Sequence, residues 1–363
     1  MEKLTFESIS ARAVLVPLKR PIVAKVGAFT EWPLILIDVT TKEGIVGRSY
    51  LEPYIKDSAK YIIPALYDMG EKFKGRQICP ADMYREIISS LHLIGRQGVS
   101  VIVAAGLDMS LWDALAKSVN LPLAQLLGGS TGELRTYNTN GLWLLPLDEL
   151  ADQAQELIGD GDFKAIKMRL GRDRLKDDIQ AIKNVRDAIG EDTHIMVDFN
   201  QGQTIQEAIT RLHGLDDQGI YWFEEPIVYD NYALNAQLAA EIRTPLSIGE
   251  NIYGPRSFLE AIQAKAADLY MPDLMRIGGV TGWMSAAAIA GAAGAPLSSH
   301  LYKEVSAHLL KASESADWLE YSDWGNPVIK EPFEVKNGMA IVPDRIGNGI
   351  DWDEDAVKKY QYI

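Results

Sequence analysis

The second part of this chain repeats one short unit, an apolar run of strand length followed by a segment with helical periodicity. Eight such runs occur from residue 135 onward, and helical segments such as 203–215 and 257–266 separate them. The runs lie at 135–141, 163–170, 194–200, 220–226, 245–251, 267–273, 295–300 and 317–322. Near-continuous apolar strands that alternate with helices are typical of a parallel sheet covered by helices. Eight such units over roughly 190 residues favour a closed barrel.

An open, doubly wound sheet is the alternative arrangement for the same alternation of strands and helices. Such a sheet more often carries a glycine-rich phosphate-binding turn after its first strand. Residues 137–141 read Tyr-Asn-Thr-Asn-Gly, which is not a turn of that kind. We therefore predict an α/β fold in which residues 127–322 form the barrel.

The N-terminal part of the chain, residues 1–126, follows a different pattern. Strand-like alternation occurs at 9–17, 33–39 and 45–51, with a predicted turn at 41–44 between the last two. From about residue 57 the period becomes helical, and residues 99–118 suit a buried helix. A meander followed by helices predicts a small α+β domain ahead of the barrel.

Charge and composition exclude several classes of function. The net charge of −14 would repel polyanions, so nucleic acids and anionic membranes are not expected partners, whereas a small anionic substrate is. Cys79 is the only cysteine, which excludes a disulfide framework and a cysteine metal site. The N-terminus lacks the basic-then-apolar order of a signal peptide, and we expect no apolar run of membrane length. These features predict a soluble, cytoplasmic protein.

Residues that can take part in chemistry end the predicted strands from the second onward. They are Lys167 with Arg169, Asp198 with Asn200, Glu224 with Glu225, Glu250 with Asn251, Asp273, His300 and Glu320. The carboxyl ends of parallel barrel strands lie on one face, so these side chains should converge in one pocket. Acidic residues after strands can instead cap the helices that follow. That explanation is weak for the whole set, because glutamate is a poor cap and the pairs end strands rather than start helices.

Three of these carboxylates, Asp198, Glu224 and Glu250, come from neighbouring predicted strands. Carboxylates that share a water-poor pocket repel one another strongly unless a cation lies between them. Ligands that are all oxygen, without cysteine or histidine, favour a hard ion. We therefore predict a Mg²⁺ site, with Mn²⁺ or Ca²⁺ as less favoured occupants.

Two further pairs of residues flank the predicted metal site. Lys167 and Arg169 are two positions apart, so both side chains point to the same side of their strand, where they could hold an anionic substrate. Asp273 and His300 end adjacent strands on the opposite side. A carboxylate bonded to one imidazole nitrogen orients the ring and makes the other nitrogen a better base.

Several motifs in this order resemble the metal-binding signature of the enolase superfamily and, within it, the mandelate racemase subgroup. The motifs are Val-Asp-Phe-Asn-Gln at 197–201, Trp-Phe-Glu-Glu-Pro at 222–226, Ile-Gly-Glu-Asn at 248–251, Met-Pro-Asp at 271–273, Arg-Ile-Gly-Gly-Val-Thr-Gly-Trp at 276–283, Ser-Ser-His-Leu at 298–301, Ser-Ala-His-Leu-Leu at 306–310 and Trp-Leu-Glu at 318–320. The resemblance covers nearly the whole chain.

This resemblance implies a fold and an organisation for the chain. The fold is a modified TIM barrel, (β/α)₇β, over residues 127–322, with residues 1–126 as a capping domain packed over its mouth. Residues 21–32 resemble the flexible lid loop over the substrate, and residues 323–363 are expected to return to the capping domain. Relatives of this kind are usually symmetric assemblies, so a homo-oligomer is expected.

The resemblance also implies an activity, the Mg²⁺-dependent removal of the proton next to a substrate carboxylate to give a metal-stabilised enolate. Asp198, Glu224 and Glu250 would bind the metal. Lys167 would neutralise the substrate carboxylate, Glu320 in protonated form would donate a short hydrogen bond to it, and His300, oriented by Asp273, would act as acid or base. The expected substrate contacts are Asn200, Glu225, Asn140, Lys25, Phe29 and Tyr54. Asn200 could equally orient the metal carboxylates or cap a helix.

Arg169 departs from the family pattern, in which a lysine at this position is the second base. A guanidinium is effectively always protonated, which makes it a poor proton acceptor. Racemisation needs a base on each face of the substrate, whereas dehydration of an acid sugar needs only His300 as base and acid. The predicted lid argues in the other direction, because Ile22, Val26 and Phe29 are apolar and a polyol would require more polar groups.

We weigh three functions on this basis. Racemisation or epimerisation of a 2-hydroxycarboxylate is slightly favoured by the mixed lid and by the whole-chain resemblance. Dehydration of an acid sugar is the alternative. A catalytically inert barrel that binds metal or carboxylates is the third, and it is disfavoured because the three metal carboxylates and His300 are all present.

Overall fold

The computed structural model describes residues 3–24 and 27–363, and its larger part is a barrel of parallel strands. The barrel strands are β4 (Gly132–Asn138), β5 (Ala165–Arg169), β6 (His194–Asp198), β7 (Ile220–Glu224), β8 (Leu246–Ile248), β9 (Leu269–Tyr270) and β10 (Leu319–Tyr321). Neighbours in sequence from β4 to β9 pair in parallel, and β10 pairs in parallel with β4. This confirms the predicted parallel barrel.

The ring closes between β9 and β10 through the segment predicted as the seventh strand. This segment, 295–300, is reduced to isolated bridges: Leu297 pairs with Tyr270 and Ala316, and His300 pairs with Asp273. The predicted strand over 295–300 is therefore not formed along its length, and that prediction was wrong. The bridges still bring the end of this segment to the same face as the other strand ends.

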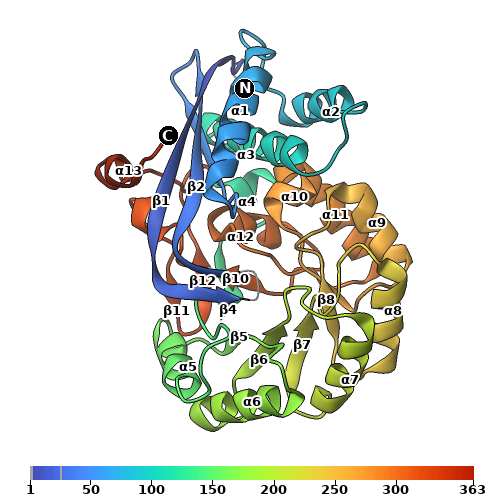
Figure 1. Ribbon diagram of the computed structural model, residues 1–363. Coiled ribbons are helices and arrows are strands. Elements are labelled where there is room, and N and C mark those ends of the chain that lie inside the picture. The colour runs from blue at the N-terminus through green and yellow to red at the C-terminus, as the bar shows by residue number, and fades with distance from the viewer. Residues whose placement is uncertain (1–2, 25–26) are drawn as a thin grey trace.

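Helices surround the barrel, as Figure 1 shows most clearly for α5 to α9. They are α5 (Leu150–Gly159), α6 (Leu175–Ile189), α7 (Ile205–Leu215), α8 (Tyr232–Glu241), α9 (Gly254–Gln263), α10 (Leu274–Ile277), α11 (Gly279–Ala293) and α12 (Lys303–Lys311). The start of α7 follows the expected capping chemistry, since Thr204 and Glu207 form a reciprocal capping box. Large side chains such as Tyr137, Met196 and Trp222 form a separate buried cluster contributed by the barrel strands.

The N-terminal domain combines a three-stranded antiparallel sheet with helices. Its elements are β1 (Phe6–Ala24), β2 (Gly27–Thr41), β3 (Val46–Leu51), a 3₁₀ turn at Lys56–Ser58, α1 (Ala59–Glu71), α2 (Pro80–Ser90), α3 (Val99–Ser118) and α4 (Leu123–Leu126). The turn predicted at 41–44 is present, because Thr41 N–H donates to Ile45 O and Gly44 N–H to Thr41 O.

The predicted lid, residues 21–32, is not a loop over most of its length. Residues 21–24 belong to β1 and 27–32 to β2, and Ile22 pairs with Phe29 in the antiparallel register. The two long strands form a hairpin that extends from the N-terminal domain down over the barrel (Figure 1). Strand pairing therefore holds residues 21–24 and 27–32 over the barrel.

Helix α3 corrects one expectation about membrane segments. By length and composition it could cross a membrane, so the prediction that no run reaches that size was wrong. However, 72% of its most apolar window is buried within the protein. Its close approach to β3 is shown at Gly47, where an added Cβ would lie 2.1 Å from the carbonyl oxygen of Ser110. Burial on several sides identifies α3 as a core helix.

The C-terminal segment contacts both parts of the molecule. It contains a 3₁₀ turn (Asn326–Val328), β11 (Val335–Lys336), β12 (Met339–Val342) and α13 (Glu354–Tyr360). β12 pairs antiparallel with β4 of the barrel. Beyond α13, the backbone N–H of Tyr362 donates to Ala13 O at 2.9 Å, so the chain ends against β1.

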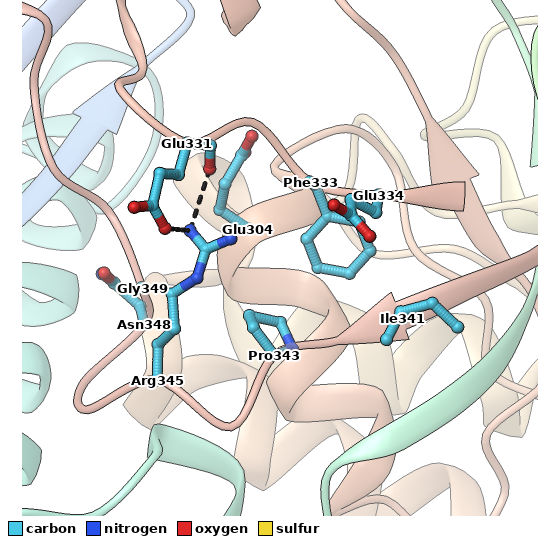
Figure 2. A pocket seen from close by; sticks show the side chains of 9 residues that line it. All are labelled: Glu304, Glu331, Phe333, Glu334, Ile341, Pro343, Arg345, Asn348 and Gly349. Atoms are coloured by element: carbon cyan, nitrogen blue, oxygen red, sulfur yellow. Dashed lines mark hydrogen bonds and ion pairs between the residues drawn. The ribbon is translucent and has the colours of Figure 1, made fainter. Parts of the chain in front are cut away.

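A small cavity of about 160 Å³ lies between this segment and α12 (Figure 2). Arg345 extends into it, and its Nη1 atom donates to Glu331 O at 2.9 Å and lies 3.3 Å from Glu331 Oε2. Glu304 of α12 also lines the cavity and is paired with Lys303 at 2.7 Å. None of the predicted site residues lines this cavity.

Candidate active site

A larger cavity, about 380 Å³ in volume, lies at the carboxyl ends of the barrel strands beneath the β1–β2 hairpin. Its floor carries the charged residues that the strand pattern predicted, and its walls are mainly apolar and aromatic. The lining residues are Ile22, Phe29, Trp32, Tyr54, Ile55, Trp143, Lys167, Arg169, Asp198, Asn200, Glu250, His300, Leu301, Glu320 and Trp324.

Three carboxylates meet at the cavity floor, where Asp198 and Glu250 line the cavity and Glu224 is buried beside them. Asp198 ends β6, Glu224 ends β7 and Glu250 follows β8, and each offers an oxygen within 4.8 Å of the other two. Two amides hold them: Asn200 donates its backbone N–H and its Nδ2 to Asp198, both at 2.7 Å, and Asn251 Nδ2 donates to Glu250 Oε1 at 3.0 Å. A buried, all-oxygen set of this kind fits a hard divalent cation such as Mg²⁺.

The electrostatics of this cluster agree with a cation site. Burial raises the pKa of Asp198 and of Glu224, and neighbouring carboxylates raise both further against the opposing charge of Lys167. Like-charged groups in a buried site disfavour ionisation unless positive charge is supplied. Lys167, Arg169 and His300 lie beside these carboxylates, but Lys167 also pairs with Glu320, so a further cation between the three carboxylates would lower their mutual repulsion.

Lys167 lies at the centre of the floor. Its Nζ is 2.9 Å from Glu224 Oε1, 2.6 Å from Glu320 Oε1 and 3.9 Å from Asp198 Oδ2. Burial lowers the pKa of Lys167, but the surrounding carboxylates outweigh burial and raise it above its usual range. The ammonium is therefore held as a fixed positive charge.

Glu320 lies between Lys167 and His300. Burial raises its pKa, but Lys167, His300 and the backbone N–H of Leu301, which donates to Oε2 at 2.8 Å, lower it to about 2. The donation of a hydrogen bond by protonated Glu320 to a substrate carboxylate stays a prediction. In this arrangement Glu320 is the counter-ion of Lys167.

His300 and Asp273 form the expected pair. Asp273 caps α10 through Oδ1, which accepts the backbone N–H groups of Met275 and Arg276. Its Oδ2 atom is 2.7 Å from His300 Nδ1, which fixes the ring and directs Nε2 to the cavity, 3.2 Å from Glu250 Oε2. Burial lowers the pKa of His300, but Glu250, Glu320 and Asp273 outweigh it and raise the pKa to about 10.

Arg169 is held firmly in place. Its Nη1 donates to the carbonyl oxygens of Thr139 and Gly141 at 3.0 and 3.1 Å, and its Nη2 donates to Thr139 Oγ1 at 2.7 Å. The guanidinium lies 3.8 Å from the ring centroid of Trp143, a stacking arrangement that favours the cation. Nε is buried without a hydrogen-bond partner, 3.7 Å from Asp198 Oδ2.

The predicted substrate contacts divide into two groups. Asn200, Phe29 and Tyr54 line the cavity, and Tyr54 reaches it from the N-terminal domain as the sequence suggested. Asn140 and Glu225 do not line it: Asn140 bonds to Asn138 and to the backbone of Asp323, and Glu225 lies buried beside Asn251. Lys25 lies outside the described residues.

The strand-end pattern did not identify the aromatic residues of the cavity. Trp32 comes from β2, Trp143 from the loop after β4, and Trp324 from the C-terminal segment. Trp143 follows a barrel strand on the catalytic face, and Trp32 ends the segment 21–32 that was predicted as the lid, so both carried a signal in the sequence. Trp32 and Trp324 belong to segments whose position over the barrel depends on tertiary packing.

Comparison with known proteins places this fold and site in a family. Residues 8–128 match the family described as "Mandelate racemase / muconate lactonizing enzyme, N-terminal domain", and residues 149–356 match "Enolase C-terminal domain-like". The chain therefore belongs to the mandelate racemase/muconate lactonizing enzyme family of the enolase superfamily. This agrees with the resemblance in the sequence motifs.

Similar solved structures cover the whole chain. An enolase from the alpha proteobacterium BAL199 with bound magnesium is 50% identical, with a TM-score of 0.97 over 99% of this chain and 100% of that one. An enolase from Bradyrhizobium complexed with magnesium and mandelic acid is 36% identical, with a TM-score of 0.96 and full coverage of both chains. L-talarate/galactarate dehydratase of Salmonella typhimurium is 30% identical over 90% of this chain and 82% of its own.

Proposed function

We propose that this protein is a Mg²⁺-dependent enzyme that removes the proton next to the carboxylate of a small 2-hydroxycarboxylate. The observation that carries the proposal is the convergence of Asp198, Glu224 and Glu250 between Lys167 on one side and the Asp273–His300 pair on the other. Magnesium in the similar structures supports the assignment of the cation.

The side chains around the cavity have distinct tasks in this reaction. An α-proton beside a carboxylate is very weakly acidic, because its removal adds a second negative charge to the same group. Lys167 places a buried, fixed cation where that charge develops, a form of stabilisation that often dominates catalysis. Bound Mg²⁺ would supply further positive charge to the substrate carboxylate and would offset the charge of Glu250 beside His300.

His300 is the acid/base group on one face of the substrate. With Nδ1 donating to Asp273, its Nε2 atom takes up the α-proton when the ring is neutral and returns it when the ring is charged. Asp273 is itself held by two backbone N–H groups, so the ring keeps its orientation through both steps. The same atom could deliver a proton to a departing β-hydroxyl.

Racemisation or epimerisation is the first candidate outcome. The aromatic walls suit a substrate with an apolar side chain, because a polyol would leave its hydroxyl groups without partners there. The mandelic acid in the Bradyrhizobium structure is a 2-hydroxycarboxylate of this type. This outcome requires Arg169 to exchange a proton on the second face.

Dehydration is the second candidate, and the geometry of Arg169 favours it. Both terminal nitrogens of the guanidinium already donate to Thr139 and Gly141, and stacking on Trp143 stabilises the charged form. A group held in this way is a poor proton acceptor. If His300 is the one available base, it can remove the α-proton and then protonate the departing β-hydroxyl, which completes a dehydration. Inversion would need a second acid/base group on the other face of the substrate. The Salmonella relative is a dehydratase.

One experiment tests the proposal and separates its two outcomes. The protein with Mg²⁺ is incubated in D₂O with mandelate and with a set of sugar acids, and the α-proton signal is followed by NMR. Loss of that signal is expected for at least one compound, with inversion for a racemase and a 2-keto product for a dehydratase. Intact α-protons in every compound at saturating concentration would reject the proposal, and the inert barrel would then be the better description.

Two further properties belong to this proposal. A cytoplasmic location is proposed from the single cysteine, which is typical of a reducing compartment. A homo-oligomer is proposed from the usual symmetric assembly of such enzymes. Sedimentation of the purified protein would test the second property directly.

A further inference from the structure

A short hydrogen bond joins the wall of the cavity to a buried carboxylate that the proposed reaction does not use. Trp32 Nε1 donates to Glu52 Oε2 at 2.6 Å, and the two residues are only 3% and 2% exposed. Trp32 lines the cavity, whereas Glu52 does not. The Glu52 carboxyl group therefore contacts the cavity wall through the indole of Trp32.

Trp32 is the central residue of a continuous aromatic wall. Its ring packs on Tyr54 with centroids 5.2 Å apart and on Trp324 at 4.6 Å. Trp324 lies 6.4 Å from Trp143, which in turn covers Arg169. Because the rings contact one another at fixed angles, a rotation of Trp32 would change the shape of the whole wall.

Glu52 is itself fixed from the barrel side. Its backbone N–H donates to the hydroxyl of Tyr302 at 2.9 Å, and Tyr302 follows His300 by two residues. Asp273, Lys303 and Glu304 are the charged groups that act on its carboxyl. Burial raises the pKa of Glu52 to about 8. Burying this carboxyl group costs free energy that an exposed position would not cost.

We propose that Glu52 is a positioning residue of the substrate site, which holds the indole of Trp32 in the orientation that accepts a flat, apolar substituent. Glu52 would then determine which side chain on the substrate is preferred, without taking part in proton transfer. This inference rests on the proposed function, because it assumes that the carboxylate end of the ligand lies on the cavity floor.

The first test is spectroscopic and needs no substrate. Of the eight indole N–H signals in a spectrum of ¹⁵N-labelled protein, Trp32→Phe identifies that of Trp32. A strong bond to a carboxyl oxygen shifts such a proton downfield. Glu52→Leu should move the Trp32 signal upfield. Glu52→Gln keeps an oxygen acceptor for the indole N–H, so the signal should stay downfield. A signal that Glu52→Leu leaves unchanged would overturn the inference.

The second test separates selectivity from general damage. Dissociation constants of mandelate and of lactate are measured by calorimetry with saturating Mg²⁺. Glu52→Leu should weaken the binding of mandelate by about fivefold and change the binding of lactate little, because only the aryl ring of mandelate contacts the aromatic wall. Glu52→Gln should restore the preference. Equal weakening of both ligands would mean a structural role and would overturn the inference.

The two failures can be told apart. If the unaltered protein binds neither ligand in the presence of Mg²⁺, the proposed function fails and the positioning role fails with it. If both ligands bind but their ratio is the same in Glu52→Leu, only the positioning role is rejected. Trp32→Phe serves as the matched variant, since it removes the donor of the same bond and should reproduce the Glu52→Leu preference.

Discussion

Arg169 stands where a second acid/base group would face the substrate, yet its guanidinium already donates to three oxygen atoms. A lysine there would have a compact ammonium whose pKa shifts readily when buried, so it could release and accept a proton. We expect Arg169→Lys to raise the rate of inversion of mandelate by about tenfold or more. Polarimetry measures inversion, and exchange in D₂O measures proton removal on the His300 face.

The control for this change is Arg169→Met, which removes the charge and offers no base. It should leave inversion at or below the original rate. If Arg169→Lys leaves the ratio of inversion to exchange unchanged, residue 169 has no part in proton transfer. In that case the dehydratase outcome gains support.

Lys167 competes with a metal ion for the same carboxylates, because its Nζ is 2.9 Å from Glu224 Oε1 and 3.9 Å from Asp198 Oδ2. Removal of this charge should strengthen Mg²⁺ binding, by tenfold or more on a rough Coulomb estimate. In the proposed reaction the same change removes the charge that would stabilise the transition state, so turnover should fall about a thousandfold. Calorimetric titration of Lys167→Met with Mg²⁺ measures the first effect.

Glu224→Gln is the matched comparison for Lys167→Met, since it removes the other partner of the same ion pair. It should weaken Mg²⁺ binding rather than strengthen it. A loss of Mg²⁺ affinity in both variants would show that Lys167 mainly positions Glu224.

At the scale of elements, the fit between β3 and α3 limits what the N-terminal domain can tolerate. A Cβ at Gly47 would lie 2.1 Å from Ser110 O and 2.8 Å from the backbone N of Ala114, so the helix itself would have to move. We expect Gly47→Ala to lower the free energy of unfolding by about 2 kcal/mol. Urea denaturation followed by circular dichroism measures this change.

Gly159, the last residue of α5, provides the control, because nothing lies within 4 Å of an added Cβ there. Gly159→Ala should be neutral or stabilising by about 0.5 kcal/mol, since alanine favours the helix. Equal destabilisation by both substitutions would contradict the close contact between β3 and α3.

The elements that sequence could predict are those set by local periodicity. Helix 99–118 matches α3 at both ends, and the strands that carry Arg169, Asp198 and Glu224 end at these residues. The segment 295–300 reads as a strand but makes only bridges, because pairing depends on partners that an apolar pattern does not reveal. For the same reason residues 21–24 and 27–32, which belong to β1 and β2, were predicted as part of a loop.

At the scale of the whole molecule, most of the floor of the site could be predicted from the sequence, but its walls only in part, through Phe29 and Tyr54. The floor comes from one repeated unit, so strand ends fall on one face by topology alone. The wall combines Trp32, Trp143 and Trp324, which come from the hairpin, a barrel loop and the C-terminal segment. Contact among segments so distant in sequence follows from packing, which no local pattern encodes. The substrate side chain is therefore the least predictable part of the function.

His308 gives the stability of the whole molecule a dependence on pH. It lies on α12 of the barrel, and its Nδ1 accepts the backbone N–H of Ala124 in α4, the connection to the N-terminal domain. Burial lowers the pKa of His308 to about 4 from 6.5. A histidine whose pKa is depressed on folding contributes stability above its unfolded pKa, and this contribution declines as the pH falls toward the folded value.

Between pH 7.5 and pH 5.0 this one residue should therefore remove about 2 kcal/mol from the free energy of unfolding. Carboxylates elsewhere also titrate in this range, so the comparison is with His308→Gln, which cannot gain a proton. Urea denaturation of both proteins at the two pH values isolates the effect as the difference between their losses. The variant should be the less stable protein at pH 7.5 and should lose less on acidification. If the free energy of unfolding falls equally in the two proteins, the imidazole either stays neutral or is hydrated when it is protonated.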